Sequence, residues 1–358
     1  MVSRCGLQRQ SLYVMLMTGI GCAPADPSMI RAEVETGASS SHIVSPDAKL
    51  ERLFDGGCFL TEGVAAGPDG SIYFSDITLT DICRDERGVR EAGHMWRYDP
   101  ATGKTSIFRS PSGMSNGKKF DAHGNMIVAE GADFGGRRVI RTDMKTGKSY
   151  IIAGLFEGRP FNAPNDVALD EKGRIYFTDP RYGGHEPVEQ PVMGVYRIDR
   201  DGSIHRIITD LGKPNGIAVS PNQKSLYVGS HDDGATGLLP EGARARKGEM
   251  CVWQYDLAED GTVGNKRQFA NYLPEDGPDG LVPDVEGNLY VAVRNVKRPG
   301  IYVYSPEGKE LAYIPTPDLP TYVGFGRAEE RKTLYVTSGK CLYRIKLEKE
   351  GYQLPPNQ

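Results

Sequence analysis

The chain has 358 residues, 43 Lys and Arg against 47 Asp and Glu, a formal charge of −4 and 39% hydrophobic residues. This composition is ample for a large hydrophobic core, and the length permits one to three domains. Because no basic run or patch stands out, we expect no nucleic-acid partner.

Residues 1–25 have the pattern of a secretory signal peptide. Two arginines precede an apolar run, residues 11–22, that is too short to span a bilayer, and Ala23-Pro24-Ala25 fits an A-x-A cleavage site. We therefore expect export, to a bacterial periplasm or the extracellular space, and no membrane span. A lipid anchor at Cys22 is one alternative, because Gly21-Cys22 resembles a lipoprotein box. A chance apolar run in a cytoplasmic protein is the other.

Six related stretches organise the rest of the chain. Each has a polar opening residue, an apolar run, a turn and a second β-prone run, which is typical of a tight hairpin. From the opening residue to the second run the offsets are 10, 10, 10, 11, 10 and 13 residues. The opening residues are Glu62, Asn116, Asn165, Asn215, Asp279 and Thr321.

A third and a fourth β-prone run follow each hairpin, except in the last unit, which ends after the third. An unpaired run at residues 49–54 precedes the first unit and can supply the missing strand. Repeats near 50 residues indicate an array whose units cannot bury their faces alone. The prediction is an all-β, six-bladed β-propeller of four antiparallel strands per blade, closed by an N-terminal strand. It occupies residues 45–350 as one domain, after a linker at 26–44; a pair of β-sandwiches is the rival fold.

The six cysteines show no C-x-x-C pair, so the sequence does not support a zinc ribbon or a redox motif. We expect buried free thiols. A disulfide between Cys58 and Cys83 is the alternative if the protein is exported.

The six opening positions are expected to converge at one end of the propeller channel, because the first strand of every blade lines it. All six side chains carry oxygen, and none is His or Cys. Such a ring suits a hard divalent cation, Ca²⁺ first, and is a poor zinc site. The alternative is that Asn-Gly and Asp-Gly are ordinary turn dipeptides.

At these motifs the chain resembles the gluconolactonase and senescence-marker-protein (regucalcin) family of calcium-dependent propeller hydrolases, with diisopropyl fluorophosphatase a more distant relative. The resemblance spans roughly residues 48–347. The motifs that carry it are Glu62-Gly63, residues 161–167, residues 176–183, Pro214-Asn215-Gly216, Pro278-Asp279-Gly280 and residues 334–337.

The resemblance implies a metal site and a substrate pocket. The metal ligands would be Glu62, Asn215 and Asp279, with Asn165 a fourth ligand or a substrate contact. Arg159 resembles an arginine that holds substrate oxygens, and Asn116 would line the same pocket. We take the cation to be Ca²⁺, with Mg²⁺, Mn²⁺ or Zn²⁺ as alternatives.

The predicted reaction is hydrolysis of a sugar lactone by a metal-polarised carbonyl and an activated water, with Asp279 as general base. His231, which we also place at the substrate, and His185 are back-up bases. A phosphotriesterase or fluorophosphatase would use the same ring, and a non-catalytic binding propeller is the third possibility. We expect a monomer or a dimer.

Residues at the ends of the second strands, such as Asp76 and Asp179, are expected to lie beside the ring. There they either orient the ligands or, as is more common, cap the ends of strands by bonding backbone amides.

Overall fold

The computed structural model describes residues 30–31, 43–79, 82–236 and 246–354. The predicted signal peptide, Cys22 and most of the predicted linker at 26–44 lie outside these ranges. Within them, no helix is long and apolar enough to cross a membrane.

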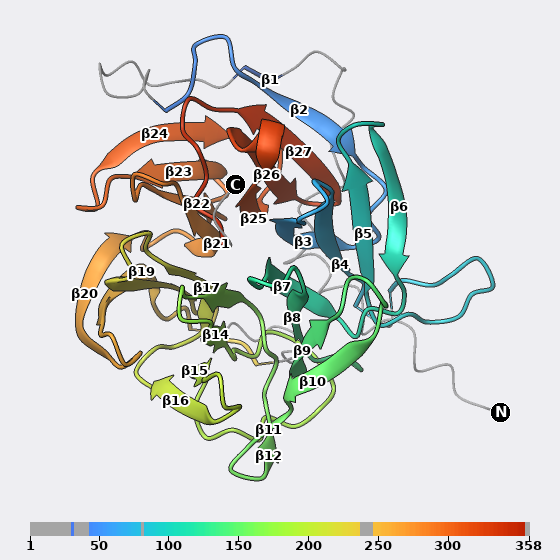
Figure 1. Cartoon of the computed structure of the whole chain (residues 1–358), viewed down its shortest axis with the longest axis vertical. Helices are drawn as coiled ribbons and strands as arrows, with labels where there is room; N and C mark the ends of the chain where they lie inside the picture. The colour runs from blue at the N-terminus through green and yellow to red at the C-terminus, as the bar shows by residue number, and fades with distance from the viewer. Residues whose placement is uncertain (1–29, 32–42, 80–81, 237–245, 355–358) are drawn as a thin grey trace, which may run out of the picture.

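Six antiparallel sheets, the blades, surround a central channel (Figure 1). Each blade contains four strands in order from the channel outwards. The predicted six-bladed propeller is confirmed. The innermost strands are β3 (Leu60–Ala66), β7 (Ser115–Phe120), β13 (Val167–Leu169), β17 (Pro214–Val219), β21 (Pro278–Pro283) and β25 (Pro320–Phe325). The second strands are β4 (Ile72–Ile77), β8 (Met126–Glu130), β14 (Ile175–Thr178), β18 (Ser225–His231), β22 (Leu289–Val293) and β26 (Thr333–Ser338).

The two outer positions complete each blade. The third strands are β5 (His94–Asp99), β9 (Arg138–Thr142), β15 (Val195–Ile198), β19 (Met250–Leu257), β23 (Gly300–Tyr304) and β27 (Cys341–Lys346). The fourth strands are β6 (Lys104–Arg109), β10 (Ser149–Ala153), β16 (Ile204–Ile208), β20 (Val263–Asn271), β24 (Glu310–Pro315) and, from the N-terminal side, β2 (Lys49–Phe54).

The propeller closes as predicted, because β2 pairs antiparallel with β27 in the sixth blade. Arg52 lies opposite Tyr343, and Glu51 lies opposite Arg344 and accepts a hydrogen bond of 2.8 Å from its Nε. Strands from both ends of the described chain therefore share one sheet. A short strand that sequence reasoning did not predict, β1 (Ile30–Arg31), adds to the outer edge of β2.

In three blades the hairpin between the first and second strands depends on an aspartate and a glycine. In the third blade Asp170 accepts a 2.9 Å hydrogen bond from the amide of Arg174, and Gly173 takes a φ of 79°. Asp121 with Gly124 and Asp284 with Gly287 repeat the arrangement. Aspartate bonds its own backbone in turns, and glycine takes a positive φ without a steric penalty.

The hydrophobic core lies between neighbouring blades. One cluster joins Tyr176 of the third blade to Ile217, Leu226 and Val228 of the fourth, and all four are buried. Because each blade can bury its faces only against its neighbours, the propeller is a single cooperative unit.

The C-terminal tail covers the channel end opposite the predicted ring. Gln353 donates from Nε2 to Phe325 O at 2.6 Å and to Gly326 O at 2.7 Å, and the Tyr352 amide donates to Pro283 O at 3.1 Å. Tail residues and apolar residues of the inner strands, including Val64 and Leu281, line a cavity there. The other end of the channel, where the six opening residues lie, is the polar end.

The expectation of free thiols is wrong for three cysteines. Cys58 and Cys83 form a disulfide, because the loop after β4 folds back onto the start of β3 and brings their Cα atoms to 6.1 Å. Cys341 is also disulfide-bonded, whereas Cys251 is a buried free thiol as expected.

Candidate functional site

The ring residues lie at irregularities in the inner strands. The pairing of the first and second strands shifts register at this position in five blades, at Glu62/Val64, Ser115/Lys118, Pro214/Ile217, Pro278/Leu281 and Pro320/Tyr322. A β-bulge bends a strand and re-aims its side chains, which frees this position from the regular alternation. In these five blades the opening residue therefore stands at the same backbone distortion.

The glycine that follows a ring residue allows neighbouring inner strands to approach closely. A Cβ on Gly63 would lie 2.2 Å from the carbonyl oxygen of Asn116, and one on Gly216 would lie 2.2 Å from that of Asp279. These glycines stand in strands, so Asn-Gly and Asp-Gly are not turn dipeptides here. Their role is to bring each ring residue against the next blade.

Glu62 and Asp279 form the acidic part of the ring. Their residue exposures are only 5% and 6%. Burial raises the pKa of Glu62 well above its ordinary value, and the nearby Asp279 carboxylate raises that pKa further. Burial likewise raises the pKa of Asp279 to about 7. Two buried carboxylates that oppose each other's ionisation are a site that a cation would stabilise.

Asn215 is oriented from the fourth blade. Its Nδ2 donates to the Tyr182 hydroxyl at 3.1 Å, and the Asn215 side chain lowers the pKa of the neighbouring Asp279 carboxyl. This bond uses the amide nitrogen, so Oδ1 remains for another partner. Tyr182 in turn donates to the backbone oxygen of His231 at 3.0 Å.

The remaining ring positions differ in what they offer. Asn165 is half-buried; its amide donates to Thr178 O at 2.9 Å, so its backbone is fixed beside the ring. Asn116 is buried, and its backbone oxygen accepts from Ser75 Oγ at 2.9 Å. The Thr321 hydroxyl donates to Thr61 O at 2.7 Å, so it closes the seam between the sixth and first blades.

The structure does not bring Arg159 to the ring. It lies in β12 (Arg159–Pro160), a peripheral hairpin with β11 (Leu155–Phe156), where it is exposed and its Nη1 donates to Glu189 O at 3.3 Å (Figure 1). This position gives no support to the predicted substrate contact, because the hairpin holds the side chain at the outer edge of the blade.

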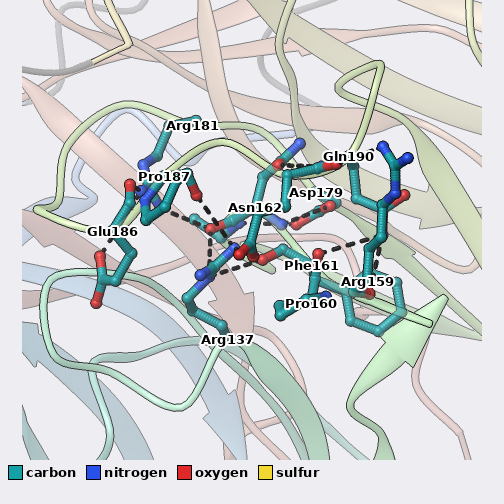
Figure 2. A network of polar contacts seen from close by, with 12 residues as sticks. Arg137, Arg159, Pro160, Phe161, Asn162, Asp179, Arg181, Glu186, Pro187 and Gln190 are labelled. Atoms are coloured by element: carbon teal, nitrogen blue, oxygen red, sulfur yellow. Dashed lines mark hydrogen bonds and ion pairs between the residues drawn. The ribbon is translucent and has the colours of Figure 1, made fainter.

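Figure 2 shows Arg159 at the edge of a polar network that supports the loop before Asn165. In that network Asp179 accepts from the amides of Asn162 at 2.9 Å and Ala163 at 2.8 Å, and buried Arg181 donates to Asn162 O at 2.7 Å. Burial raises the pKa of Asp179 to about 7. The network fixes the chain that leads into the ring.

Two residues at the ends of the second strands, Asp76 and Asp179, cap backbone amides, which is the commoner of the two roles we expected. Besides Asp179, Asp76 accepts from the amide of Cys58 at 2.8 Å and from Trp96 Nε1 at 3.2 Å. These carboxylates hold the loops that enter the inner strands.

His231 ends β18 and is 8% exposed; its Nδ1 has no hydrogen-bond partner among the described residues. Burial and the Arg294 cation lower its pKa to about 4. It is therefore neutral at pH 7 and a weak base. His185, the other back-up base, is half-exposed and lies 2.6 Å from Asp133.

Asp166 and Tyr322 are functional neighbours that sequence reasoning missed. The Tyr322 hydroxyl donates to Asp166 Oδ1, and Asp166 Oδ2 accepts from the Ile217 amide at 2.9 Å. Lys119 Nζ donates to the Tyr322 hydroxyl at 3.3 Å. The signal was present in the repeat: the residue after the ring position is Gly in four units, but Asp166 in the third and Tyr322 in the sixth. These two side chains span the channel and meet.

Arg294 was also missed. Its Nη1 lies 3.6 Å from Asp279 Oδ2, and its side chain is 12% exposed. Arg294 comes directly after Val293, which pairs with Pro278, and His231 comes directly after Ser230, which pairs with Pro214. Arg294 and His231 therefore occupy the same register position in adjacent blades. A charged or titratable residue there in two units was the signal that pointed to it.

The donor set fits a divalent cation with oxygen ligands. Among the described residues, no group of three or more His, Cys, Asp or Glu side chains could hold a metal ion. A cation at the ring would therefore rest on two carboxylates, from Glu62 and Asp279, together with amide oxygens from Asn165 and Asn215. Carboxylates and carbonyl-type oxygens are the ligands that Ca²⁺ prefers.

Several known proteins are similar to this chain over most of its length. Gluconolactonase from Zymomonas mobilis is 29% identical over 287 residues, which are 73% of this chain and 74% of that protein. Diisopropyl-fluorophosphatase from Loligo vulgaris is 26% identical over 309 residues, 81% of this chain and 90% of that protein. The structure of a gluconolactonase from Xanthomonas campestris superimposes with a TM-score of 0.71 at 26% identity and covers 90% of this chain and 96% of that one.

Residues 60–340 match the family described as the SMP-30/Gluconolactonase/LRE-like region. This match spans every blade and includes all six ring positions. The protein belongs to the SMP-30/gluconolactonase/LRE-like family.

Proposed function

We propose that the protein is a lactonase that hydrolyses sugar lactones at the ring end of the channel. The observation that carries this proposal is the buried pair Glu62 and Asp279, held beside Asn215 at the polar end of a family propeller. Several similar proteins are named as lactonases, among them the Zymomonas gluconolactonase and the pentonolactonase of Haloferax volcanii.

Glu62, Asn165, Asn215 and Asp279 would hold a divalent cation, most favourably Ca²⁺. When bound, such a cation supplies Lewis-acid polarisation of the lactone carbonyl. The family membership and the oxygen-only donor set support this assignment, and calcium-binding regucalcin has the same fold, with a TM-score of 0.64.

Asp279 is our proposed general base. A carboxylate has two oxygens, so one can hold the cation while the other accepts a proton from water. A bound cation would lower the pKa of about 7 that burial gives Asp279, and this keeps the carboxylate ionised at neutral pH. The Asp279 carboxylate takes a proton from water as the water oxygen bonds to the carbonyl carbon. The ring C–O bond then breaks, its electron pair goes to the ring oxygen, and that oxygen takes a proton to become a hydroxyl.

The first test is acid release from glucono-1,5-lactone above the spontaneous rate, before and after EDTA and then with Ca²⁺ restored. Activity should be lost with EDTA and regained with calcium. Asp279→Asn should reduce turnover at least about 10²-fold, the usual scale for losing general-base catalysis, and leave the thermal unfolding transition cooperative.

Asp260→Asn is the matched control, because Asp260 lies in an exposed turn where it accepts from Thr262 Oγ1 at 2.6 Å. Full activity in the Asp279→Asn protein would remove Asp279 from the mechanism. Activity that survives complete removal of the cation would contradict the metal assignment but not the lactonase proposal.

A phosphotriester hydrolase is the second candidate, and the extended similarity to diisopropyl-fluorophosphatase favours it. It would use the same ring. If no lactone is opened while a fluorophosphate or phosphotriester is hydrolysed in a cation-dependent way, this candidate replaces the lactonase.

Export remains part of the proposal. The Cys58–Cys83 disulfide supports it, because disulfides persist in oxidising compartments. Cell fractionation of the producing organism would test it, and recovery of the protein in the cytoplasm with free thiols at both positions would contradict it.

A further inference from the structure

Arg294 is a cation beside the ring residue Asp279. Its backbone amide donates to Gly277 O at 3.1 Å, just before the ring strand β21, which fixes the start of the side chain. The Arg294 charge lowers the pKa of Glu62 and of Asp279, and it also lowers the pKa of His231. These three residues come from the first, fifth and fourth blades. The contact that places the guanidinium is with Asp279, whose Oδ2 lies 3.6 Å from Arg294 Nη1.

The guanidinium is not fully used by the protein. Nη1 is buried and has no hydrogen-bond partner among the described residues. Its nearest carboxylate oxygen, Asp279 Oδ2 at 3.6 Å, is near enough for attraction but too far for a hydrogen bond. A buried donor without an acceptor is unfavourable, so this atom is poised for an acceptor that the protein does not provide.

We propose that Arg294 is a further catalytic residue, whose Nη1 donates to the lactone carbonyl oxygen and to the carboxylate that this group becomes. This inference rests on the proposed lactonase function. The attack of water moves the carbonyl π electrons onto that oxygen, and they return when the ring C–O bond breaks. A guanidinium is a permanent donor that suits both the developing negative charge and the planar carboxylate product.

The competing interpretation is that Arg294 only balances the charge of the acid pair. In that case its removal would change cation affinity but not the recognition of carboxylates. The two interpretations separate because a neutral ligand and a carboxylate ligand of the same polyol skeleton should respond differently.

The activity arm uses Arg294→Ala, Arg294→Lys and the control Arg298→Met, all saturated with Ca²⁺. Arg298 pairs with Glu310 at 3.0 Å on the blade edge. Arg294→Ala should lower kcat about 10²- to 10³-fold, the cost of one oxyanion donor. Added guanidinium ion should restore part of that loss, and Arg298→Met should match the wild type. Unchanged kcat in Arg294→Ala would overturn the proposal.

The binding arm uses D-gluconate, the carboxylate product, and D-sorbitol, its neutral analogue, titrated by calorimetry. Arg294→Ala should weaken gluconate binding at least about tenfold, as for loss of a charge-assisted hydrogen bond, and leave sorbitol unchanged. Equal losses for both ligands, or none for gluconate, would overturn the assignment.

The two arms also separate the failure of this inference from that of the lactonase proposal. If the wild type opens no lactone, the lactonase proposal fails and the gluconate titration alone decides Arg294. If the wild type is active and both arms show no change, Arg294 fails alone. Arg294→Lys keeps a charge near the acid pair, so it provides a folded variant for both arms if Arg294→Ala is unstable.

Discussion

Glu62, Asp279 and His231 are titratable groups that the fold holds out of water, and each has a pKa displaced by burial. For the two acids, burial favours the protonated form; for the histidine, it favours the neutral form. Their charge states at neutral pH therefore depend on their charged neighbours, which include Arg294 for all three groups and Asp279 for Glu62. Displaced pKa values gather at functional sites, which agrees with the ring as the place of chemistry.

His231 makes stability depend on pH in a defined window. Its folded pKa of about 4 lies below the ordinary 6.5, so the unfolded chain takes up the proton first as the pH falls. The His231 contribution to the unfolding free energy is therefore constant above about pH 7, decreases toward pH 4 and is then constant again. The total loss is roughly 3 kcal/mol.

Denaturant unfolding of the wild type and His231→Gln at pH 7.5 and pH 5 would measure this effect. The wild type should lose more stability than the variant, because both proteins keep the same acids. His205→Gln, at a half-exposed position near Asp199, is the control. Equal losses in the wild type and His231→Gln would show that His231 is not held neutral.

At the scale of elements, the inner strands of neighbouring blades approach one another closely around the channel axis. The position after the ring residue is glycine in four of them, and the two exceptions, Asp166 and Tyr322, hydrogen-bond each other. A Cβ on Gly117 would meet Asp166 Oδ1 at 2.2 Å, and one on Gly280 would meet the Tyr322 ring at 2.2 Å. The glycines thus leave the space that the aspartate and the tyrosine occupy.

Gly216→Ala should disrupt both the packing and the site. Its Cβ would lie 2.2 Å from Asp279 O, so β17 or β21 must move. We expect a loss of roughly 1–3 kcal/mol of unfolding free energy, as for other overpacked interiors, and a strong loss of lactone hydrolysis. Thermal melts and rate assays on one preparation would measure both.

Gly264→Ala is the matched control for that experiment. Gly264 lies in the outer strand β20, with open space where its Cβ would be. It should keep both stability and activity. If Gly216→Ala behaved like Gly264→Ala, close approach of the inner strands would not be what demands glycine.

At the scale of the whole molecule, closure makes six blades into one folding unit. Only β2, from the N-terminal side, completes the sixth blade. A chain that begins at Gly57 lacks this strand and should melt at least roughly 10 °C lower, with a broader transition, since lost pairing lowers stability at a few degrees per kcal/mol.

A chain that begins at His42 keeps β2 and is the control. Scanning calorimetry would compare the two. Equal melting temperatures would show that the β2–β27 pairing contributes nothing to closure.

The sequence by itself determined the repeat, the strand order and the position of the ring. Alternating apolar runs and turn residues depend on local backbone preferences, which are present in the sequence whatever lies nearby. The nearly fixed offset from Glu62, Asn116 and Asn215 to their second strands showed that these residues occupy equivalent positions in their blades. The motifs around Asn215 and Asp279 also identified the family, which the match to residues 60–340 bears out.

Only the tertiary structure decided which side chains share space. Arg294 lies 3.6 Å from Asp279, and Tyr322 meets Asp166 across the channel although 156 positions separate them in the sequence. Cys58 pairs with Cys83 because a loop folds back, and Arg159 is carried outward by a hairpin that the sequence did not reveal. Such contacts depend on how blades close around an axis, and closure is a property of all six blades together rather than of any one stretch.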